Sequence, residues 1–355
     1  MKAKSLLLPT SVVVFATAVG FSSPQQTETP AEKEFKNIQV FKGKPAREVR
    51  PAMEGITAAL GVGCDFCHAQ DAKGEFQWDK DDKEPKKTAR EMVVMMNNIN
   101  KQNFDGRMEV TCATCHQGHS SPNRLAPIGQ PRQQPPKGED AATLPSGESL
   151  VDKYVTAVGG SATEKITTLS VKGTSKTAFG GFPFETYAKS SGKLLKLMTF
   201  PNGVYTQTYD GTAAWSHFGT ETAQVEGPEL ARYLIYSPLA ALSPKASFQG
   251  YRRVRKDTFD GKDVFVVDAQ TKTEGLRARL YFDAATGLLA RKMTMMQTLV
   301  GAVPVTEDYS DYREVSGVKI PFKVVETNSS GVYSMEAAEV KANEDIPDAK
   351  FGKPK

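Results

Sequence analysis

Two short motifs contain all four cysteines of this 355-residue sequence. They read Cys64-Asp65-Phe66-Cys67-His68 and Cys112-Ala113-Thr114-Cys115-His116. In a C-x-x-C-H motif the two thiols are spaced to add to the two vinyl groups of one haem. The histidine that follows then places an imidazole beneath the iron. The motifs therefore predict two covalently attached c-type haems, held by Cys64, Cys67, Cys112 and Cys115, with His68 and His116 as iron ligands.

Three other uses of the cysteines explain the pattern less well. A zinc site would use the thiols as two C-x-x-C knuckles, but Cys67 and Cys112 are much further apart than the usual ~15–20 residues. A disulfide within each motif would be strained and redox-active rather than stabilising. A thioredoxin-like motif needs only one pair. Covalent haem is the interpretation that uses every one of these residues.

The ligand on the opposite face of each iron decides between an electron carrier and a catalyst, because an open face admits peroxide or oxygen. His119 follows His116 too closely to reach that face without a reversal, and His217 belongs to a strand-rich region. Methionine is the remaining candidate. The sulfur donors that precede the motifs are Met53 for the first and Met92, Met95 and Met96 for the second. A methionine-rich helix face is usually core packing, but beside a haem without another candidate ligand we favour ligation.

Two helices must position these groups. Met53, Ile56 and Leu60 have helical spacing, which predicts a helix that begins near Pro51 and ends at Gly61. A second helix is expected from Pro85 to about Asn103, with its methionines on or near one face. Phe66, Trp78 and Phe104 either shield the haems or belong to the core. Arg90 either neutralises a haem propionate or is solvated.

The first residues read as an export signal. Lys2 and Lys4 precede an apolar run from Leu6 to Phe21, and Ala16-Thr17-Ala18 offers a cleavage site. We therefore expect a signal peptide over 1–23 and a periplasmic protein. The alternative is an uncleaved segment that anchors the protein to the membrane. In an oxidising compartment, unpaired thiols form disulfides unless another chemistry uses them, which again favours haem.

Composition limits the other possibilities. The mean hydropathy of -0.41 excludes a protein that spans the membrane many times. The net charge of +4 is spread along the chain without a basic block, so no nucleic-acid partner is expected.

The chain divides into regions that differ in composition and in the pattern of apolar residues. An extended polar segment is expected over 24–44 and a small all-α dihaem cytochrome c domain, with helices packed on the two haems, over 45–120. A proline-rich linker covers 121–147. Residues 148–355 show strand patterns with turn signals between them, a first helix from Glu148 to Val158 and another from Pro228 to Tyr236. The fold class is thus multidomain, with an α+β domain built on a large, curved antiparallel sheet. Its expected strands are 167–177, 184–188, 194–200, 204–209, 264–269, 278–282, 288–295, 319–326 and 332–340.

The haem segments resemble those of the cytochrome c subunit of photosynthetic reaction centres. The resemblance covers about residues 40–125. It rests on Met53 to His68, ending in Leu60-Gly61-Val62-Gly63-Cys64-Asp65-Phe66-Cys67-His68, and on Ala89-Arg90-Glu91-Met92-Val93-Val94-Met95-Met96 leading to the second motif. In that family a helix packs along each haem face and supplies a methionine sulfur. The resemblance therefore implies Met53 as ligand of the first iron and Met92 of the second, with Met95 as runner-up. This chain differs from the photosynthetic members of the family in two respects. It has two motifs where they carry four haems, and Gln117 replaces the arginine that usually follows the second motif.

Residues about 148–353 resemble the outer-membrane lipoprotein-sorting carrier fold, in which a curved antiparallel sheet and its helices enclose an apolar cavity. The residues that carry this resemblance are Tyr209-Asp210-Gly211 before Trp215, Tyr281-Phe282-Asp283, and Gly317-Val318-Lys319-Ile320-Pro321-Phe322. It implies a lipid or apolar ligand in the sheet domain.

Three functions follow as hypotheses. The first is a periplasmic dihaem cytochrome that passes electrons between redox partner proteins through two His/Met-ligated haems. The second is a dihaem peroxidase-type enzyme with one open haem, and the third is a haem-linked protein that binds a lipid or a partner. An electron carrier fits the methionines better than a catalyst does.

Overall fold

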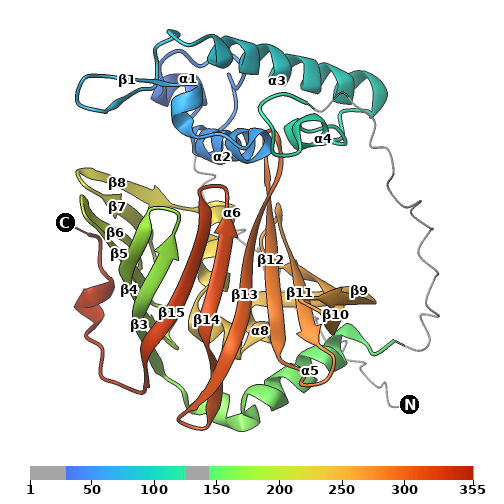
Figure 1. The fold of residues 1–355 in the computed structure, drawn as a ribbon, viewed down its shortest axis with the longest axis vertical. Coiled ribbons are helices and arrows are strands. Elements are labelled where there is room, and N and C mark those ends of the chain that lie inside the picture. Colours follow the sequence, from blue (N-terminus) through green and yellow to red (C-terminus); the bar gives the residue numbers. More distant parts are fainter. Residues whose placement is uncertain (1–28, 123, 125–143, 355) are drawn as a thin grey trace, which may run out of the picture.

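A small helical part and a large sheet part make up the molecule (Figure 1). The structure, a computed structural model, describes residues 29–122, 124 and 144–354. The expected signal peptide over 1–23 and most of the proline-rich linker over 121–147 lie outside the described residues.

The helical part covers residues 29–124 and contains both C-x-x-C-H motifs. In chain order its elements are α1 (Ala31–Glu34), η1 (Ala46–Glu48), α2 (Val49–Leu60), η2 (Cys64–Phe66), β1 (Ala69–Gln70), β2 (Phe76–Gln77), α3 (Glu84–Asn103) and α4 (Cys112–His116). The two long helices predicted from the sequence are present. α2 ends where Gly61 adopts a left-handed conformation and its N–H donates to the Thr57 carbonyl, a common helix stop.

We expected the segment 24–44 to be extended because it is polar. The structure shows that it is not extended throughout. Its described part contains α1, and the Ala31 N–H donates to the Lys44 carbonyl over 2.8 Å. Phe41 is buried in the core between α2 and α3. Burial of this one aromatic side chain thus holds the segment against the helices. The average composition of the segment does not reveal a single buried aromatic residue.

Helices α2 and α4 meet at two glycines. The Gly118 N–H donates to the Ala59 carbonyl over 2.8 Å. A Cβ on Gly61 would lie only 2.1 Å from the Gly118 carbonyl oxygen. Gly61 precedes the first motif and Gly118 follows the second, so this contact brings the two motifs to one side of the helical part.

The sheet part is built on one antiparallel sheet of 13 strands in the order β8-β7-β6-β5-β4-β3-β15-β14-β13-β12-β11-β10-β9. β3 to β8 form one meander and β9 to β15 another, and pairing of β3 with β15 joins the two. The strands are β3 (Thr168–Thr177), β4 (Gly180–Lys189), β5 (Leu194–Phe200), β6 (Gly203–Tyr209), β7 (Ala214–Phe218), β8 (Glu221–Val225), β9 (Phe248–Phe259), β10 (Lys262–Thr271), β11 (Leu276–Asp283), β12 (Leu289–Thr298), β13 (Gly301–Val315), β14 (Val318–Asn328) and β15 (Gly331–Ala342).

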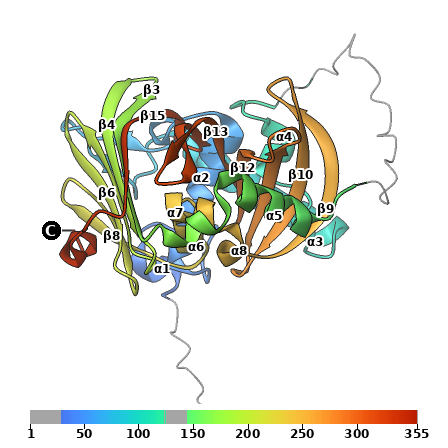
Figure 2. The same cartoon turned by 90° about the horizontal axis from the view of Figure 1, so that it is seen from below.

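Helices lie in the curve of this sheet. The chain between the meanders forms α6 (Gly227–Ile235), α7 (Pro238–Leu242) and α8 (Pro244–Ser247), which the sheet wraps around (Figure 2). α5 (Gly147–Val158) packs on β10 to β12 through a shared core that includes Tyr154 and Phe282. Two short 3-10 turns, η4 (Gly160–Lys165) and η5 (Asp348–Phe351), complete the described elements. Alternate residues of β11 are buried, which is the two-residue period of a strand with one face on the core.

The predicted large, curved antiparallel sheet is confirmed, with more strands than the sequence pattern indicated. β7, β8, β9 and β13 were not predicted. β8 has one buried residue, and β9 contains several arginines and few apolar residues. Both strands therefore lack the apolar pattern of a central strand. β8 and β9 are the edges of the sheet, where charged residues oppose pairing with other chains.

Within residues 29–122, 124 and 144–354, none of the helices combines the length and the hydropathy needed to cross a bilayer.

Replacing Gly61 by alanine should destabilise the helical part more than the same change at Gly43. Both glycines have positive φ, 65° and 74°, where alanine loses about 1–2 kcal/mol. Only the Cβ at residue 61 would also meet a backbone oxygen, because nothing lies within 4 Å of the Cβ position at residue 43. Thermal or denaturant unfolding of Gly61→Ala and Gly43→Ala measures the difference. Equal losses would show that the Gly61–Gly118 approach does not contribute.

Candidate haem-binding sites

The first C-x-x-C-H motif forms a tight turn directly after α2. Cys64 begins η2, and the His68 N–H donates to the Cys64 carbonyl over 3.0 Å. The Cys64 side chain is exposed and Cys67 is half-buried, and both are free thiols. A turn of this kind brings residues three apart to one side of the backbone. Both thiols are therefore available to one planar group.

The imidazole of His68 lies against Trp78, with ring centroids 5.0 Å apart in an edge arrangement. Burial, and after it the positive charge of Lys86, lowers the pKa of His68. The neutral imidazole is thereby favoured, and this is the form that binds a metal ion. Trp78 stacks in turn on Phe76 of β2, so the β1–β2 hairpin supports the histidine.

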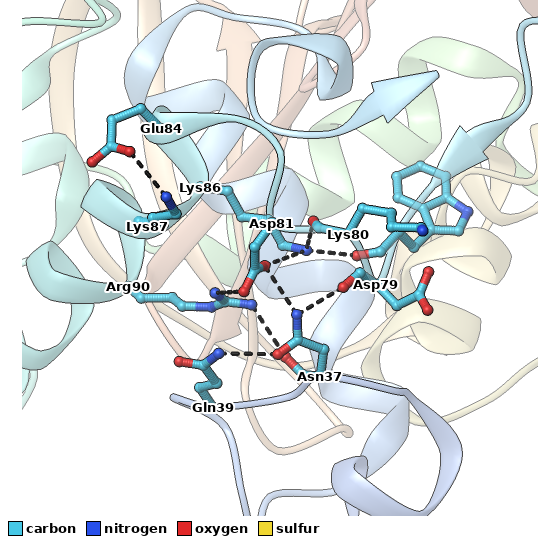
Figure 3. A network of polar contacts seen from close by, with 10 residues as sticks. Asn37, Gln39, Asp79, Lys80, Asp81, Glu84, Lys86, Lys87 and Arg90 are labelled. Atoms are coloured by element: carbon cyan, nitrogen blue, oxygen red, sulfur yellow. Dashed lines mark hydrogen bonds and ion pairs between the residues drawn. The ribbon is translucent and has the colours of Figure 1, made fainter. Parts of the chain in front are cut away.

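A polar network fixes the loop between this hairpin and α3 (Figure 3). Lys86 is buried, and its Nζ donates to the Trp78 carbonyl over 2.8 Å and pairs with Asp81 at 3.1 Å. Arg90 pairs with the same carboxylate at 2.9 Å and donates to the Asn37 carbonyl. Hydrogen bonds from Arg90 and Asn37 hold the pKa of Asp81 well below its usual range. Arg90 is therefore used within the protein rather than solvated.

The second motif is itself a helical turn, α4. Thr111 caps it, because its N–H donates to the Thr114 hydroxyl while its own side chain accepts from the backbone of residue 114. Cys115 is exposed and Cys112 half-buried, and both are free thiols.

His116 is held with one particular nitrogen available. Its Nδ1 lies 2.9 Å from the His119 carbonyl oxygen. A carbonyl oxygen can only accept, so Nδ1 carries the proton and Nε2 keeps its lone pair. Haem-ligating and metal-ligating histidines are commonly oriented by such a bond. Neither residue type nor spacing predicts this role for the backbone carbonyl of His119, whose side chain is exposed.

The candidate methionines differ in their surroundings. Met53 is partly buried and packs against the core between α2 and α3, while Met96 is 3% exposed within that core. Met92 and Met95 are 37% and 45% exposed on the outer side of α3. Met96 is therefore a core residue. Met92 and Met95 are both free to contact an added group.

Exposed apolar side chains gather in this part of the molecule. The large apolar residues left exposed in residues 29–124 are Phe35, Phe66, Trp78, Met92, Val94, Met95 and Met108. A haem macrocycle needs apolar cover, and exposed apolar side chains can supply it. The free thiols, the oriented His116 and these side chains fit covalent haem.

All four cysteines are free thiols in the described structure. In the described part of the chain, no group of three or more His, Cys, Asp or Glu side chains could hold a metal ion. His217 lies on β7 in the sheet part, with its Nδ1 2.7 Å from the Thr222 hydroxyl, far along the chain from either motif.

A separate cavity of about 640 Å³ lies between the sheet and the helices in its curve. Apolar lining residues include Phe184, Met198, Phe200, Phe218, Phe322 and Met335. Lys292 and Glu307, which pair at 3.2 Å and are almost fully buried, also line it. Burial lowers the pKa of Lys292 and raises that of Glu326, which also faces the cavity. Arg50 and Glu54 of α2 complete the wall, so the helical part closes one side.

Comparison with known proteins finds similarity to cytochromes in the N-terminal part of the chain. Residues 13–154 match the family described as photosynthetic reaction centre cytochrome C subunit. Cytochrome c-554 of Chloroflexus aurantiacus is 31% identical over 100 residues, which cover 26% of this chain and 22% of that protein. The photosynthetic reaction center cytochrome c subunit of Roseobacter denitrificans is 29% identical over 111 residues, 29% of each chain. The match thus spans less than a third of either relative.

Two solved structures are similar to part of this chain. A LolA superfamily protein from Nitrosomonas europaea is 13% identical with a TM-score of 0.42, covering 59% of this chain and 99% of that one. An outer membrane lipoprotein-sorting protein domain from Vibrio parahaemolyticus is 12% identical with a TM-score of 0.39, covering 58% and 95%.

The N-terminal part of this chain, which contains both C-x-x-C-H motifs, is similar to the photosynthetic reaction centre cytochrome c subunit family.

Proposed function

We propose that this protein is an exported dihaem c-type cytochrome that transfers electrons. The observation that carries the proposal is the pair of C-x-x-C-H turns, each with two free thiols and a following histidine, set among exposed apolar side chains. Cys64 and Cys67 would hold one haem and Cys112 and Cys115 the other. His68 and His116 would ligate the irons, with Met53 opposite the first and Met92 opposite the second.

Each haem would supply a one-electron redox centre. The chain's own residues orient and shield it. The His119 carbonyl sets the proton on His116 Nδ1, and the Lys86–Asp81–Arg90 network fixes the loop that carries Trp78 beside His68. A thioether sulfur favours the ferrous state, so His/Met ligation gives a fairly positive potential. Such centres suit exchange of electrons with redox partner proteins in the periplasm, from a soluble or membrane-anchored position.

The stoichiometry of covalent haem tests the proposal directly. The full chain is produced with a cytochrome c maturation system, and haem is quantified after denaturation together with an optical redox titration. We expect two covalent haems, both low-spin, and one in the double variant Cys112→Ala/Cys115→Ala. One high-spin haem in the unmodified protein would favour the peroxidase-type enzyme instead. No covalent haem would overturn both.

Replacing Met92 by alanine should lower the midpoint potential of the second haem and leave it covalently bound. The sulfur that stabilises ferrous iron would be lost, and axial ligands set haem potentials over a range of ~0.8 V. Val94→Ala, on the same helix and also exposed, is the matched control and should leave the potential unchanged. Met53→Ala should act on the first haem in the same way. A shift in Met95→Ala but not in Met92→Ala would assign the ligand to Met95.

The cavity favours a second candidate function, binding of an apolar or amphipathic small molecule in the sheet part. Its volume of about 640 Å³ lies within the range of ligand sites, ~300–1,000 Å³. Its lining combines aromatic and methionine side chains with a few buried polar groups, which is the usual composition of such sites.

A fluorescent fatty acid should bind saturably to the full-length protein if this second function is correct. Ala337 lines the cavity on β15, and Ala337→Trp would fill it and weaken binding by at least about tenfold, or 1.4 kcal/mol. Its exposed neighbour Ala338 does not line the cavity, so Ala338→Trp is the control. Equal binding by both variants, or no saturable binding, would contradict this function.

A further inference from the structure

The turn between β12 and β13 enters the helical part. We define the β12–β13 tip as residues 298–301, at the end of the hairpin where Thr298 pairs with Gly301. Val300 is 2% exposed and belongs to the same core as Ala52 and Ile56 of α2 and Val93 and Met96 of α3. A side chain from the sheet part is therefore a core residue of the helical part.

The tip touches α2 and the start of α4 with almost no free space. A Cβ on Gly55 of α2 would lie 2.9 Å from a methyl group of Val300. A Cβ on Gly301 would lie 2.9 Å from Cβ and Cγ2 of Thr111. Gly55 is two residues after Met53, and Thr111 is the cap of α4 that immediately precedes Cys112.

The hairpin behind the tip is firmly attached to the sheet. Lys292 and Glu307 are direct cross-strand partners in the register of β12 and β13, and they form the buried ion pair. The Lys292 Nζ also donates to the Ile235 carbonyl at the end of α6 over 2.8 Å. At the tip, the Thr298 hydroxyl donates to the Gly301 carbonyl over 2.7 Å. The tip is thus presented to the helices by a rigid element.

From these contacts we infer that the β12–β13 tip positions the haem ligands, so that the sheet part sets the potentials of the proposed haems. Val300 packs in one core with α2, which carries Met53, and with α3, which carries Met92. Gly301 approaches Thr111 at the start of the second motif. The tip acts through these residues, and the proposed ligands Met53 and Cys112 pack against the same core as Val300. This inference rests on the proposed haem function and adds a role for the sheet part that is independent of its cavity.

Two glycines with the same backbone conformation allow a matched test. Gly301 and Gly331 each begin a strand after a hairpin turn, with φ of 131° and 138°. Nothing lies within 4 Å of a Cβ at residue 331, whereas the one at residue 301 would meet Thr111. Gly301→Ala and Gly331→Ala therefore share the backbone strain and differ in the contact with the cytochrome part.

The haem-loaded full-length variants are compared by redox titration and by the methionine-to-iron charge-transfer band. We expect Gly301→Ala to lower the potential of the second haem and weaken its band, because the start of α4 is displaced. Gly331→Ala should match the unmodified protein. Identical potentials and bands in both variants, with two covalent haems present, would overturn the inference while leaving the proposed function intact. Absence of covalent haem from the unmodified protein would instead refute the proposed function.

A second series addresses the same point if Gly301→Ala does not fold. Val300→Ala would open a space in the core that α2 and α3 share and should lower the potential of at least one haem. Val300→Ile keeps an apolar, β-branched side chain and should retain both potentials. Val332→Ala, at an exposed valine of β15, is the control and should have no effect. Unchanged potentials in Val300→Ala would also overturn the inference.

Discussion

The small apolar core between α2 and α3 is the constraint on which the rest of the cytochrome part depends. Phe41, Ala52, Ile56, Val93 and Met96 hold the two helices that carry every candidate sulfur ligand of the motifs. A domain of this size buries a low fraction of its surface, so it depends on additional connections. The covalent haem attachments would provide some of these, and Val300 from the sheet part provides another. The spacing of the helices therefore depends on residues far away in the sequence.

The large sheet explains how a distant hairpin can serve this purpose. Two meanders joined through β3 and β15 give a continuous hydrogen-bonded surface, and helices inside its curve keep it from flattening. A buried ion pair such as Lys292–Glu307 is weak evidence for stability, because both ions lose their hydration. Because the two residues are cross-strand partners of β12 and β13, the pair has a different role, which is to define the register of the two strands. A slip by one residue would separate the charges, so the pair opposes any other register of the hairpin that ends at Val300.

Different local interactions hold the histidines of the two motifs. The first relies on a neighbouring hairpin and on burial of His68, which, with the charge of Lys86, lowers the pKa of the imidazole and favours its neutral form. The second relies on a capped helical turn and a backbone carbonyl that orients His116. In both arrangements one thiol is exposed and the other is half-buried, and exposed apolar side chains occur in the same part of the molecule.

The sequence by itself determined the local features of this protein. Cysteine spacing predicted the haem motifs, apolar period and Gly61 predicted α2 and its end, and alternation predicted most central strands. These signals are contained within a few neighbouring residues, so no distant contact is needed to read them. The edge strands β8 and β9 lacked such a signal, and polarity concealed the folding of the segment that carries Phe41.

Only the tertiary structure decided which methionines face outward. The sequence placed Met92, Met95 and Met96 on or near one face, but Met96 enters the core and the others do not. It also decided that Val300 joins the core formed by α2 and α3, that Gly301 touches Thr111, and that Arg90 pairs with Asp81. The physical reason is that packing between distant segments depends on shape and volume in three dimensions, which neither residue type nor spacing along the chain records.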